Sequence, residues 1–236
     1  MKKRTSRFIS LLWLISCLCW SAVPVQAQQR QDRKDAAGTP TEVPFYQGMA
    51  VGLEVAGPIS HYVLGSDIFN TELQLQCNLK NRFLPTLEVG YGKTDSTNDD
   101  NDMHYKTSAP YFRIGMDYNV FHKKPYLPGY LAVGLRYALS SFKYDVGGPD
   151  MEDPHYGGSV PFRYEGIKSN ASWIEAVVGV KVRIYKAFHM GWSLRYKMRL
   201  SVGATENAVP WYVPGFGKNS GTAFNLNYHL MYNLPF

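Results

Sequence analysis

The chain has 236 residues, of which 45% are hydrophobic and 14% aromatic, with 25 Lys and Arg against 19 Asp and Glu. Four of the cations precede Phe8, so the rest of the chain carries a net charge of only +2. The pI of about 9.1 therefore reflects the N-terminus, and no nucleic-acid partner is expected. Of the three cysteines only Cys77 lies outside the first 27 residues, which excludes a fold stabilised by internal disulfides.

Residues 1–27 have the pattern of a secretory signal peptide. The four cations precede the apolar run Phe8–Val23, and small residues then lead up to Ala27, after which we expect cleavage. The run is too short for a membrane-spanning helix. A lipoprotein box ending at Cys17 offers an alternative cleavage, which would leave a lipidated cysteine. The polar residues 28–44 that follow are expected to form a flexible periplasmic tail.

From Phe45 onward, about eight segments alternate between hydrophobic residues and polar or small residues. A period of two predicts β-strands with two different faces. The segments are 49–56, 72–79, 86–91, 112–119, 131–138, 174–184, 191–203 and 224–236. No apolar run after Val25 approaches the ~20 residues that a spanning helix needs, so a membrane would be crossed by strands.

The connections between these segments alternate in length. Long connections are expected at 57–67, 94–108, 143–169 and 204–220, and short ones at 80–82, 121–129 and 185–189. Long loops at one end and short turns at the other are typical of outer-membrane barrels. A soluble sandwich or lipocalin-like barrel is the alternative fold. Gly and Ala beside charged residues on the polar face favour a narrow, crowded lumen instead.

The last segment carries the most specific resemblance. It alternates toward a terminal aromatic residue through Tyr228, Leu230, Tyr232, Leu234 and Phe236. This strand is similar to the C-terminal strand by which the barrel-assembly machinery recognises bacterial outer-membrane barrels. Residues 45–236 thus resemble the small Gram-negative barrels of the OmpA and OmpX type. The resemblance implies an all-β, eight-stranded antiparallel transmembrane barrel in the cell outer membrane, in contact with its lipid and lipopolysaccharide.

Charged residues on the polar faces of the strands would then point into the lumen. An eight-stranded barrel has an interior just wide enough for side chains to fill, so these charges need partners. We predict a lumen plugged by a charge network of Glu54, Glu72, Glu88, Arg113, Asp117, Arg136, Glu175, Lys181, Arg183, Arg195, Lys197 and Arg199. The alternative is a narrow anion-preferring pore, or an accessory subunit of a transport or assembly complex.

Two long loops are rich in aromatic residues, Pro and Gly. Their candidate contact residues are Tyr156, Phe162, Tyr164, Trp211, Tyr212 and Phe216. Exposed, these residues would bind a protein or glycan partner; folded back, they would pack the loops together. The first possibility leads us to expect a structural or interaction protein that acts through its extracellular loops.

Metal and catalytic sites have little support in the sequence. Asp95, Asp99, Asp100 and Asp102 are weak candidates for a Ca²⁺ site, because the loop lacks the Gly and the terminal Glu of an EF-hand. His61, Ser66 and Asp67 share a connection, but their spacing marks no triad. No phosphate loop, nucleophile elbow or zinc pattern occurs, so we expect no enzyme activity, no metal and no cofactor.

Overall fold

The computed structural model describes residues 44–98, 102–124, 126–152, 157–203 and 209–234. The predicted signal peptide, the alternative site at Cys17 and all of the predicted tail except Pro44 lie outside the described residues. Within the described ranges, no helix is both long enough and apolar enough to cross a membrane.

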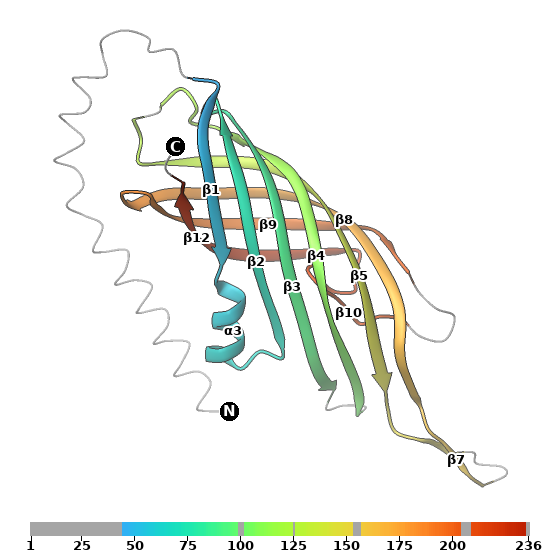
Figure 1. Ribbon diagram of the computed structural model, residues 1–236. Helices are drawn as coiled ribbons and strands as arrows, with labels where there is room; N and C mark the ends of the chain where they lie inside the picture. The colour runs from blue at the N-terminus through green and yellow to red at the C-terminus, as the bar shows by residue number, and fades with distance from the viewer. Residues whose placement is uncertain (1–43, 99–101, 125, 153–156, 204–208, 235–236) are drawn as a thin grey trace, which may run out of the picture. The chain divides into compact units, whose positions relative to one another are not determined.

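Eight strands form a closed antiparallel barrel, as the sequence predicts (Figure 1). They are β1 (Tyr46–Glu54), β2 (Ile68–Leu79), β3 (Phe83–Asn98), β4 (Met103–Asn119), β5 (Gly129–Gly147), β8 (Arg163–Tyr185), β9 (Phe188–Val202) and β12 (Thr222–Asn233). Each strand pairs with its neighbours in the chain, and β1 pairs with β12 to close the ring.

Alternate residues of each strand face the interior and the outside. On β4, buried residues such as Tyr111 and Arg113 alternate with outward residues such as Phe112 and Ile114, which are 51% and 62% exposed. The outward hydrophobic residues form an apolar belt around the barrel. On β5 this belt runs from Leu131 to Leu139, close to the ~9–11 residues of a tilted spanning strand.

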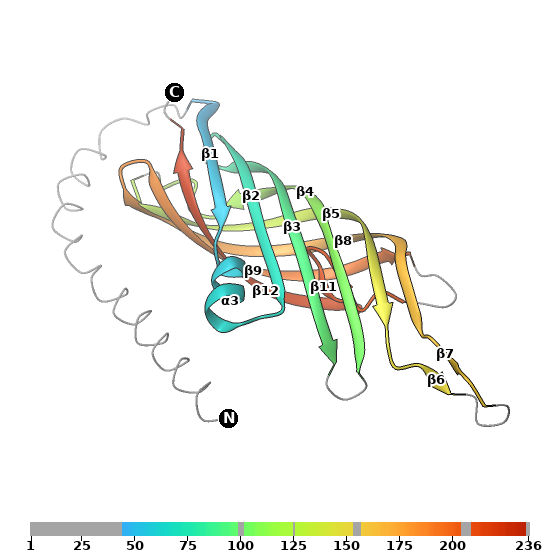
Figure 2. The ribbon, with the colours of Figure 1, turned by 60° about the horizontal axis from the view of Figure 1, so that its bottom comes forward.

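Two strand pairs continue beyond the apolar belt, where the sequence predicted loops. β3 and β4 stay paired as far as Asn98 and Met103, and β5 and β8 as far as Gly147 and Arg163. A two-stranded sheet of β6 (Met151–Glu152) and β7 (Ser159–Val160) extends the second pair (Figure 2). The predicted loops 94–108 and 143–169 are therefore wrong in large part, because polar residues on both faces hide a strand from a hydrophobic pattern.

A helix, α3 (Ala56–Leu64), follows β1 directly, where the sequence predicted the end of a strand and a loop. Pro58 lies in its first turn, where a missing N–H is tolerated, and the left-handed Gly65 (φ 67°) ends it. The Glu54 carboxylate accepts a hydrogen bond from the N–H of Gly57 at 3.1 Å and so fixes the change from strand to helix.

This change of structure leaves the wall of the barrel incomplete on one side. β1 pairs with β12 only from Ala50 to Glu54, opposite Asn233 to His229. Beyond that point the N–H of Val55 donates to the carbonyl of Tyr228 at 2.9 Å, and the ladder stops. α3 contacts β2 and the first half of β12 in the place where β1 would have continued. We call this region, between α3 and residues 223–227 of β12, the side gap.

Candidate functional site: the filled lumen

Three arginines and four carboxylates meet at the centre of the barrel and form the central charge network. Its members are Arg113, Arg136, Arg195, Glu72, Glu88, Asp117 and Glu175, all of them buried. Arg195 donates to Glu88 at 2.7 Å and to Glu72 at 2.9 Å, and its guanidinium lies 3.4 Å from Glu175. A single arginine of β9 thus joins carboxylates from three other strands, β2, β3 and β8.

The other two arginines extend this arrangement. Arg113 forms ion pairs with Glu72 and, through its Nε, with Glu175 at 2.8 Å. Arg136 holds Asp117 in a bidentate contact with two distances of 2.7 Å, and its Nε donates to Glu88 at 3.2 Å. Paired guanidinium and carboxylate groups of this kind meet the high cost of burying charge.

Neutral side chains satisfy the remaining atoms of the carboxylates. The indole of Trp173 donates to Glu175 at 2.6 Å, and Gln74 donates to Glu88 at 3.2 Å. His229 lies 3.3 Å from Glu72 through Nε2. Charges near the centre of the barrel therefore sit in a hydrogen-bonded network that spans its cross-section.

The structure buries ten of the twelve residues that the sequence assigned to the lumen. The buried anions are Glu54, Glu72, Glu88, Asp117 and Glu175, and the buried cations are Arg113, Arg136, Lys181, Arg195 and Lys197. Their formal charges balance. Lys181, in the part of the lumen near the short turns, donates to Gln76 at 3.4 Å.

The assignment of the other two residues to the network is wrong. Arg183 is exposed, because it lies at the short-turn end of β8, beside an irregularity in the pairing with β9. Arg199 is half-buried and donates to Asn219 in the loop above it, away from the central carboxylates. A bulge between Ser172 and Trp173 shifts the register of β8 just where Arg199 pairs.

The loop between β9 and β12 folds back into the barrel. Its residues 209–221 contain the short strands β10 (Tyr212–Val213) and β11 (Gly217–Lys218), and we call them the plug loop. The ammonium of Lys197 donates to the carbonyls of Gly215 at 2.7 Å and Phe216 at 3.2 Å, and Arg113 donates to Gly215 at 2.9 Å. Two lumen cations thereby hold the backbone of the plug loop.

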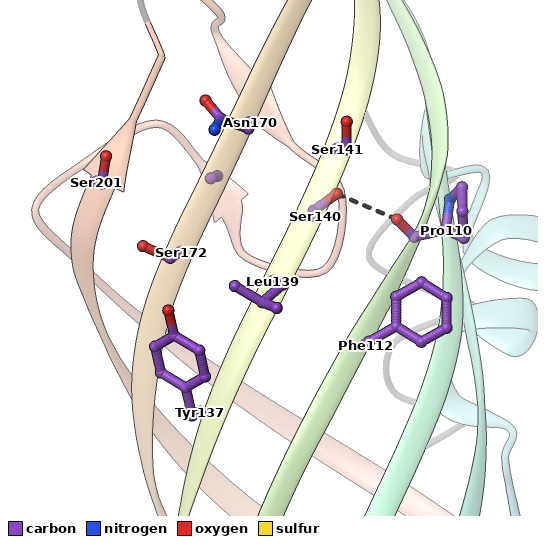
Figure 3. A pocket seen from close by; sticks show the side chains of 10 residues that line it. Pro110, Phe112, Tyr137, Leu139, Ser140, Ser141, Asn170, Ser172 and Ser201 are labelled. Atoms are coloured by element: carbon purple, nitrogen blue, oxygen red, sulfur yellow. Dashed lines mark hydrogen bonds between the residues drawn. The ribbon is translucent and has the colours of Figure 1, made fainter.

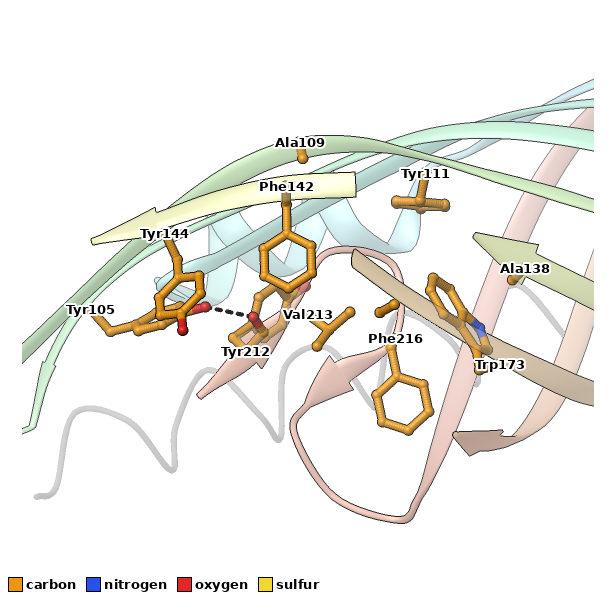
Figure 4. Packing of buried hydrophobic residues seen from close by; sticks show 11 residues of the cluster. Tyr105, Ala109, Tyr111, Ala138, Phe142, Tyr144, Trp173, Tyr212, Val213 and Phe216 are labelled. Atoms are coloured by element: carbon orange, nitrogen blue, oxygen red, sulfur yellow. Dashed lines mark hydrogen bonds between the residues drawn. The ribbon is translucent and has the colours of Figure 1, made fainter. Parts of the chain in front are cut away.

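An aromatic cluster fills the barrel around the plug loop (Figure 4). The hydroxyl of Tyr105 donates to the carbonyl of Tyr212 at 2.7 Å, and the rings of Trp173 and Phe216 meet edge to face at 5.8 Å. The strands contribute Tyr105, Ala109, Tyr111, Ala138, Phe142, Tyr144, Ala171 and Trp173 to this cluster. Sequence reasoning missed this core, although the alternation of β4 extends through Tyr105 and Tyr111 and could have indicated it.

The structure divides the predicted loop contact residues into two groups. Tyr212 and Phe216 are 1% and 3% exposed, so their assignment to an outer contact surface is wrong and they belong to the core. Trp211 is 43% exposed and Tyr164 37% exposed, and Phe162 is half-buried against the ring of Tyr164. Tyr156 lies outside the described residues.

Two cavities remain in the lumen, one on each side of the central charge network. The cavity toward the short turns measures about 50 Å³ and is lined by Gln76, Lys181, Arg136 and Arg195 among others. The cavity toward the loop end measures about 470 Å³, and Arg113 and Lys197 form part of its floor. The arginines that separate the two cavities are themselves ion-paired.

A further hollow of about 470 Å³ lies on the outer face of the barrel, across β4, β5 and β8 (Figure 3). The register of β4 with β5 is interrupted between Thr107 and Tyr111, at Pro110, which has no N–H to donate. Small polar residues such as Ser141 and Ser172 replace the large side chains of the apolar belt here. The hollow therefore marks the upper edge of the belt.

The weak metal and catalytic candidates are not brought together. Asp95 is exposed on β3, where it pairs with His104 and Lys106 at 3.4 Å each. Asp99 and Asp100 lie outside the described residues, and Asp102 occupies the turn that follows them. No group of three potential ligands able to hold a metal occurs within the described ranges. His61 binds the carbonyl of Ser66 at 2.6 Å, whereas Asp67 accepts from Ser96.

The terminal strand has the two faces that the sequence indicates. Leu230 and Tyr232 are exposed on the outer face of β12, and the ring of Tyr228 lies 5.5 Å from that of Trp192. Leu234 follows the end of the strand and is half-buried. Phe236 lies outside the described residues.

Comparison with solved structures agrees with this architecture. The chain is similar to a major outer membrane protein from Thermus thermophilus, with a TM-score of 0.50 and 10% identity over 80% of this chain and all of that one. Neisserial surface protein A gives a TM-score of 0.36 and 12% identity, covering 80% of this chain and 96% of its own. The first of these likenesses shows the fold of an outer-membrane barrel. No curated protein matches the chain. A family model described as "Domain of unknown function (DUF6048)" matches residues 5–236, and the chain therefore belongs to the DUF6048 family.

Proposed function

We propose that this protein is an integral outer-membrane barrel whose closed lumen serves as a rigid support, and that it acts through the surfaces it presents. The apolar belt supports a membrane location. Residues such as Leu135 (68% exposed) and Ile114 (62% exposed) would be unfavourable in water but suit a hydrocarbon environment. Polar residues such as Lys143 and Asp145 follow on β5 above the belt.

The single observation that carries the closed lumen is the central charge network. Its ion pairs cross the barrel between the two cavities, and the plug loop covers the network on the loop side. An ion could pass only by breaking several buried ion pairs at once, each of which would leave an unpaired charge at a cost of about 3–5 kcal/mol. The narrow anion-preferring pore is therefore the weaker alternative.

The strands that extend beyond the apolar belt supply the surfaces for interaction. The β3–β4 and β5–β8 pairs would project into the extracellular medium, and Phe162, Tyr164 and Trp211 lie at that end. A protein or glycan partner there would meet aromatic side chains on a rigid scaffold. An accessory role in a transport or assembly complex would use the same surfaces. We propose no catalytic activity.

The route to the membrane is part of the proposal. A signal peptide in residues 1–27 would direct export from a Gram-negative cytoplasm. The alternating strand β12, with Tyr228, Leu230 and Tyr232 on its outer face, would be recognised by the barrel-assembly machinery. Lipid and lipopolysaccharide would then contact the apolar belt.

Conductance in a planar lipid bilayer tests the closed lumen. The purified protein should give no stable current steps at either polarity, although heat-modifiable migration on a gel shows that it is folded. Stable, ion-selective steps from folded protein would contradict the closed lumen and support the pore.

A further inference from the structure

The large cavity at the loop end of the lumen opens sideways through the side gap. Its lining includes interior residues, Arg113 and Lys197, together with Phe224 and Leu226 from the outer face of β12. The first turn of α3, at Ala56 and Gly57, forms the opposite side. A cavity lined by both faces of one strand passes around the edge of that strand, so the interior communicates with the outside of the wall.

The edge of β12 shows that the wall is open at this level. Asn225 is an inward-facing residue by alternation with Phe224 and Leu226, yet it is exposed. Deeper in the barrel, the inward-facing Asn227 and His229 are buried. Within the described ranges, no backbone hydrogen bond joins residues 223–227 to α3 or β1. Cross-wall pairing is thus replaced by an entrance.

This entrance lies inside the apolar belt and not above it. Phe224 and Leu226 pair with Tyr196 and Leu194 of β9, while the outward residues of β9 remain hydrophobic as far as Leu200. Phe224 and Leu226 are 72% and 66% exposed. On the other side of the gap, Tyr62 of α3 is 79% exposed. Whatever enters here would come from a hydrocarbon phase.

The interior of the cavity is polar and carries more cations than anions. Arg113, Lys197 and Lys218 line it, against the single carboxylate of Glu54, which is already bound to the N–H of Gly57. Lys197 is 2% exposed, and the part of the chain that the structure describes places no carboxylate within ion-pair distance of it. Its two hydrogen bonds, to the carbonyls of Gly215 and Phe216, leave one of its three N–H donors for a ligand.

We propose that this cavity binds the anionic head group of an amphiphile that enters sideways from the membrane, with its hydrocarbon chains held among Phe224, Leu226 and α3. The inference rests on the membrane location proposed above. A volume of about 470 Å³ suits a small-molecule site, and the arrangement of an apolar mouth with a cationic floor matches the two ends of such a ligand. Lys197 is the residue that selects the negative charge.

Addition of a partner's β-strand to the free edge of β12 is the competing use of the side gap. The position of α3 argues against it, because the helix already occupies the place next to β12 that an added strand would take. A protein adduct in the experiment below would support this alternative.

Photo-crosslinking at adjacent residues tests the site in the folded protein. Benzoylphenylalanine replaces Asn225, which faces the cavity, or Leu226, which faces outward on the same strand and serves as the matched control. The full chain is reconstituted into phosphatidylcholine vesicles that contain a minor fraction of phosphatidic acid, the probe for an anionic amphiphile. The lipid adducts are then identified by mass spectrometry.

The adduct at position 225 should be enriched in phosphatidic acid by about fivefold over its share of the vesicle, whereas the adduct at 226 should follow that share. Dodecyl phosphate should compete at 225 and leave 226 unchanged. Lys197→Gln, which keeps hydrogen-bond donors for the plug loop but removes the charge, should abolish the enrichment in protein that still shows heat-modifiable migration.

Different failures have different meanings. Lipid adducts at 226 without any at 225, or adducts at 225 that match the vesicle composition, would overturn the binding site and leave the membrane location intact. No lipid adduct at either position would count against the membrane location itself. Enrichment that survives Lys197→Gln would overturn the assignment of the anionic group to this cavity floor.

Discussion

Gly215 of the plug loop lies directly against the aromatic ring of Tyr111 on β4. A Cβ atom at Gly215 would come within 2.5 Å of the ring, and one at Gly90, on the other side of Tyr111, within 2.1 Å. Gly215 also has a φ of 81°, which disfavours any other residue. The plug loop can therefore enter the barrel only because both positions lack a side chain.

Gly215→Ala should loosen the plug loop. The positive φ alone costs about 1–2 kcal/mol with a Cβ, and the collision with Tyr111 adds to it. We expect faster protease cleavage within the plug loop and a lower thermal midpoint by circular dichroism. Gly221→Ala is the matched control, since its Cβ would meet no atom within 4 Å. Equal effects of the two substitutions would contradict this role of Gly215.

Trp211 and Tyr212 are neighbours with opposite environments. Tyr212→Ala should lower the free energy of unfolding by about 3–5 kcal/mol, because it leaves a cavity in the aromatic cluster and removes the hydrogen bond to Asn70. Trp211→Ala should cost only about 1 kcal/mol, the worth of its ring contact with Tyr105. Equilibrium unfolding in urea from lipid vesicles measures both. Similar losses for the two variants would refute the inward packing of Tyr212.

Glu88 is the carboxylate on which the central charge network depends most, because all three arginines approach it. Glu88→Gln should destabilise the barrel by about 3–5 kcal/mol, since buried guanidinium groups lose their counter-charge. Asp95→Asn makes the same chemical change in an exposed ion pair with Lys106 and should cost at most about 1 kcal/mol. The same urea experiment compares them. A Glu88→Gln barrel as stable as the Asp95→Asn barrel would show that the network is dispensable.

The apolar belt can be tested with one substitution at two heights on β5. Leu135→Arg places a cation in the middle of the belt and should cost about 2–4 kcal/mol in a bilayer, whereas Ser141→Arg, above the belt, should cost about 0–1 kcal/mol. Folding yield into vesicles and urea unfolding report the difference. If both arginines were equally tolerated, the belt would not lie in a membrane.

Much of the barrel could be predicted from alternation alone. Hydrophobic residues at every second position on segments such as 131–138 specify a two-faced strand, and the inward placement of Glu88 or Arg195 follows from that period. Register was not accessible, because it depends on pairing partners far apart in the chain. The bulge that removes Arg199 from the network is one result, since a single extra residue changes the face of a strand.

Two features lay beyond the sequence for other reasons. The aromatic residues of the plug loop have the same composition whether they face a partner or the lumen, and only the glycines beside Tyr111 decide that Tyr212 enters. Residues 56–64 are short and mixed in character, so neither a strand nor a helix pattern dominates them. The helix forms because Glu54 and Gly65 define its two ends.

The short pairing of β1 with β12 also bears on how the barrel closes. These strands are the first and the last of the ring, so their contact has the largest separation along the chain and is expected to form late in folding. It is also held by a ladder that runs only from Ala50 to Glu54, compared with one from Gly129 to Gly147 between β5 and β8. The join between the two ends of the sheet is thus both the slowest to form and the easiest to separate, which makes it the natural place for amide hydrogen exchange to begin.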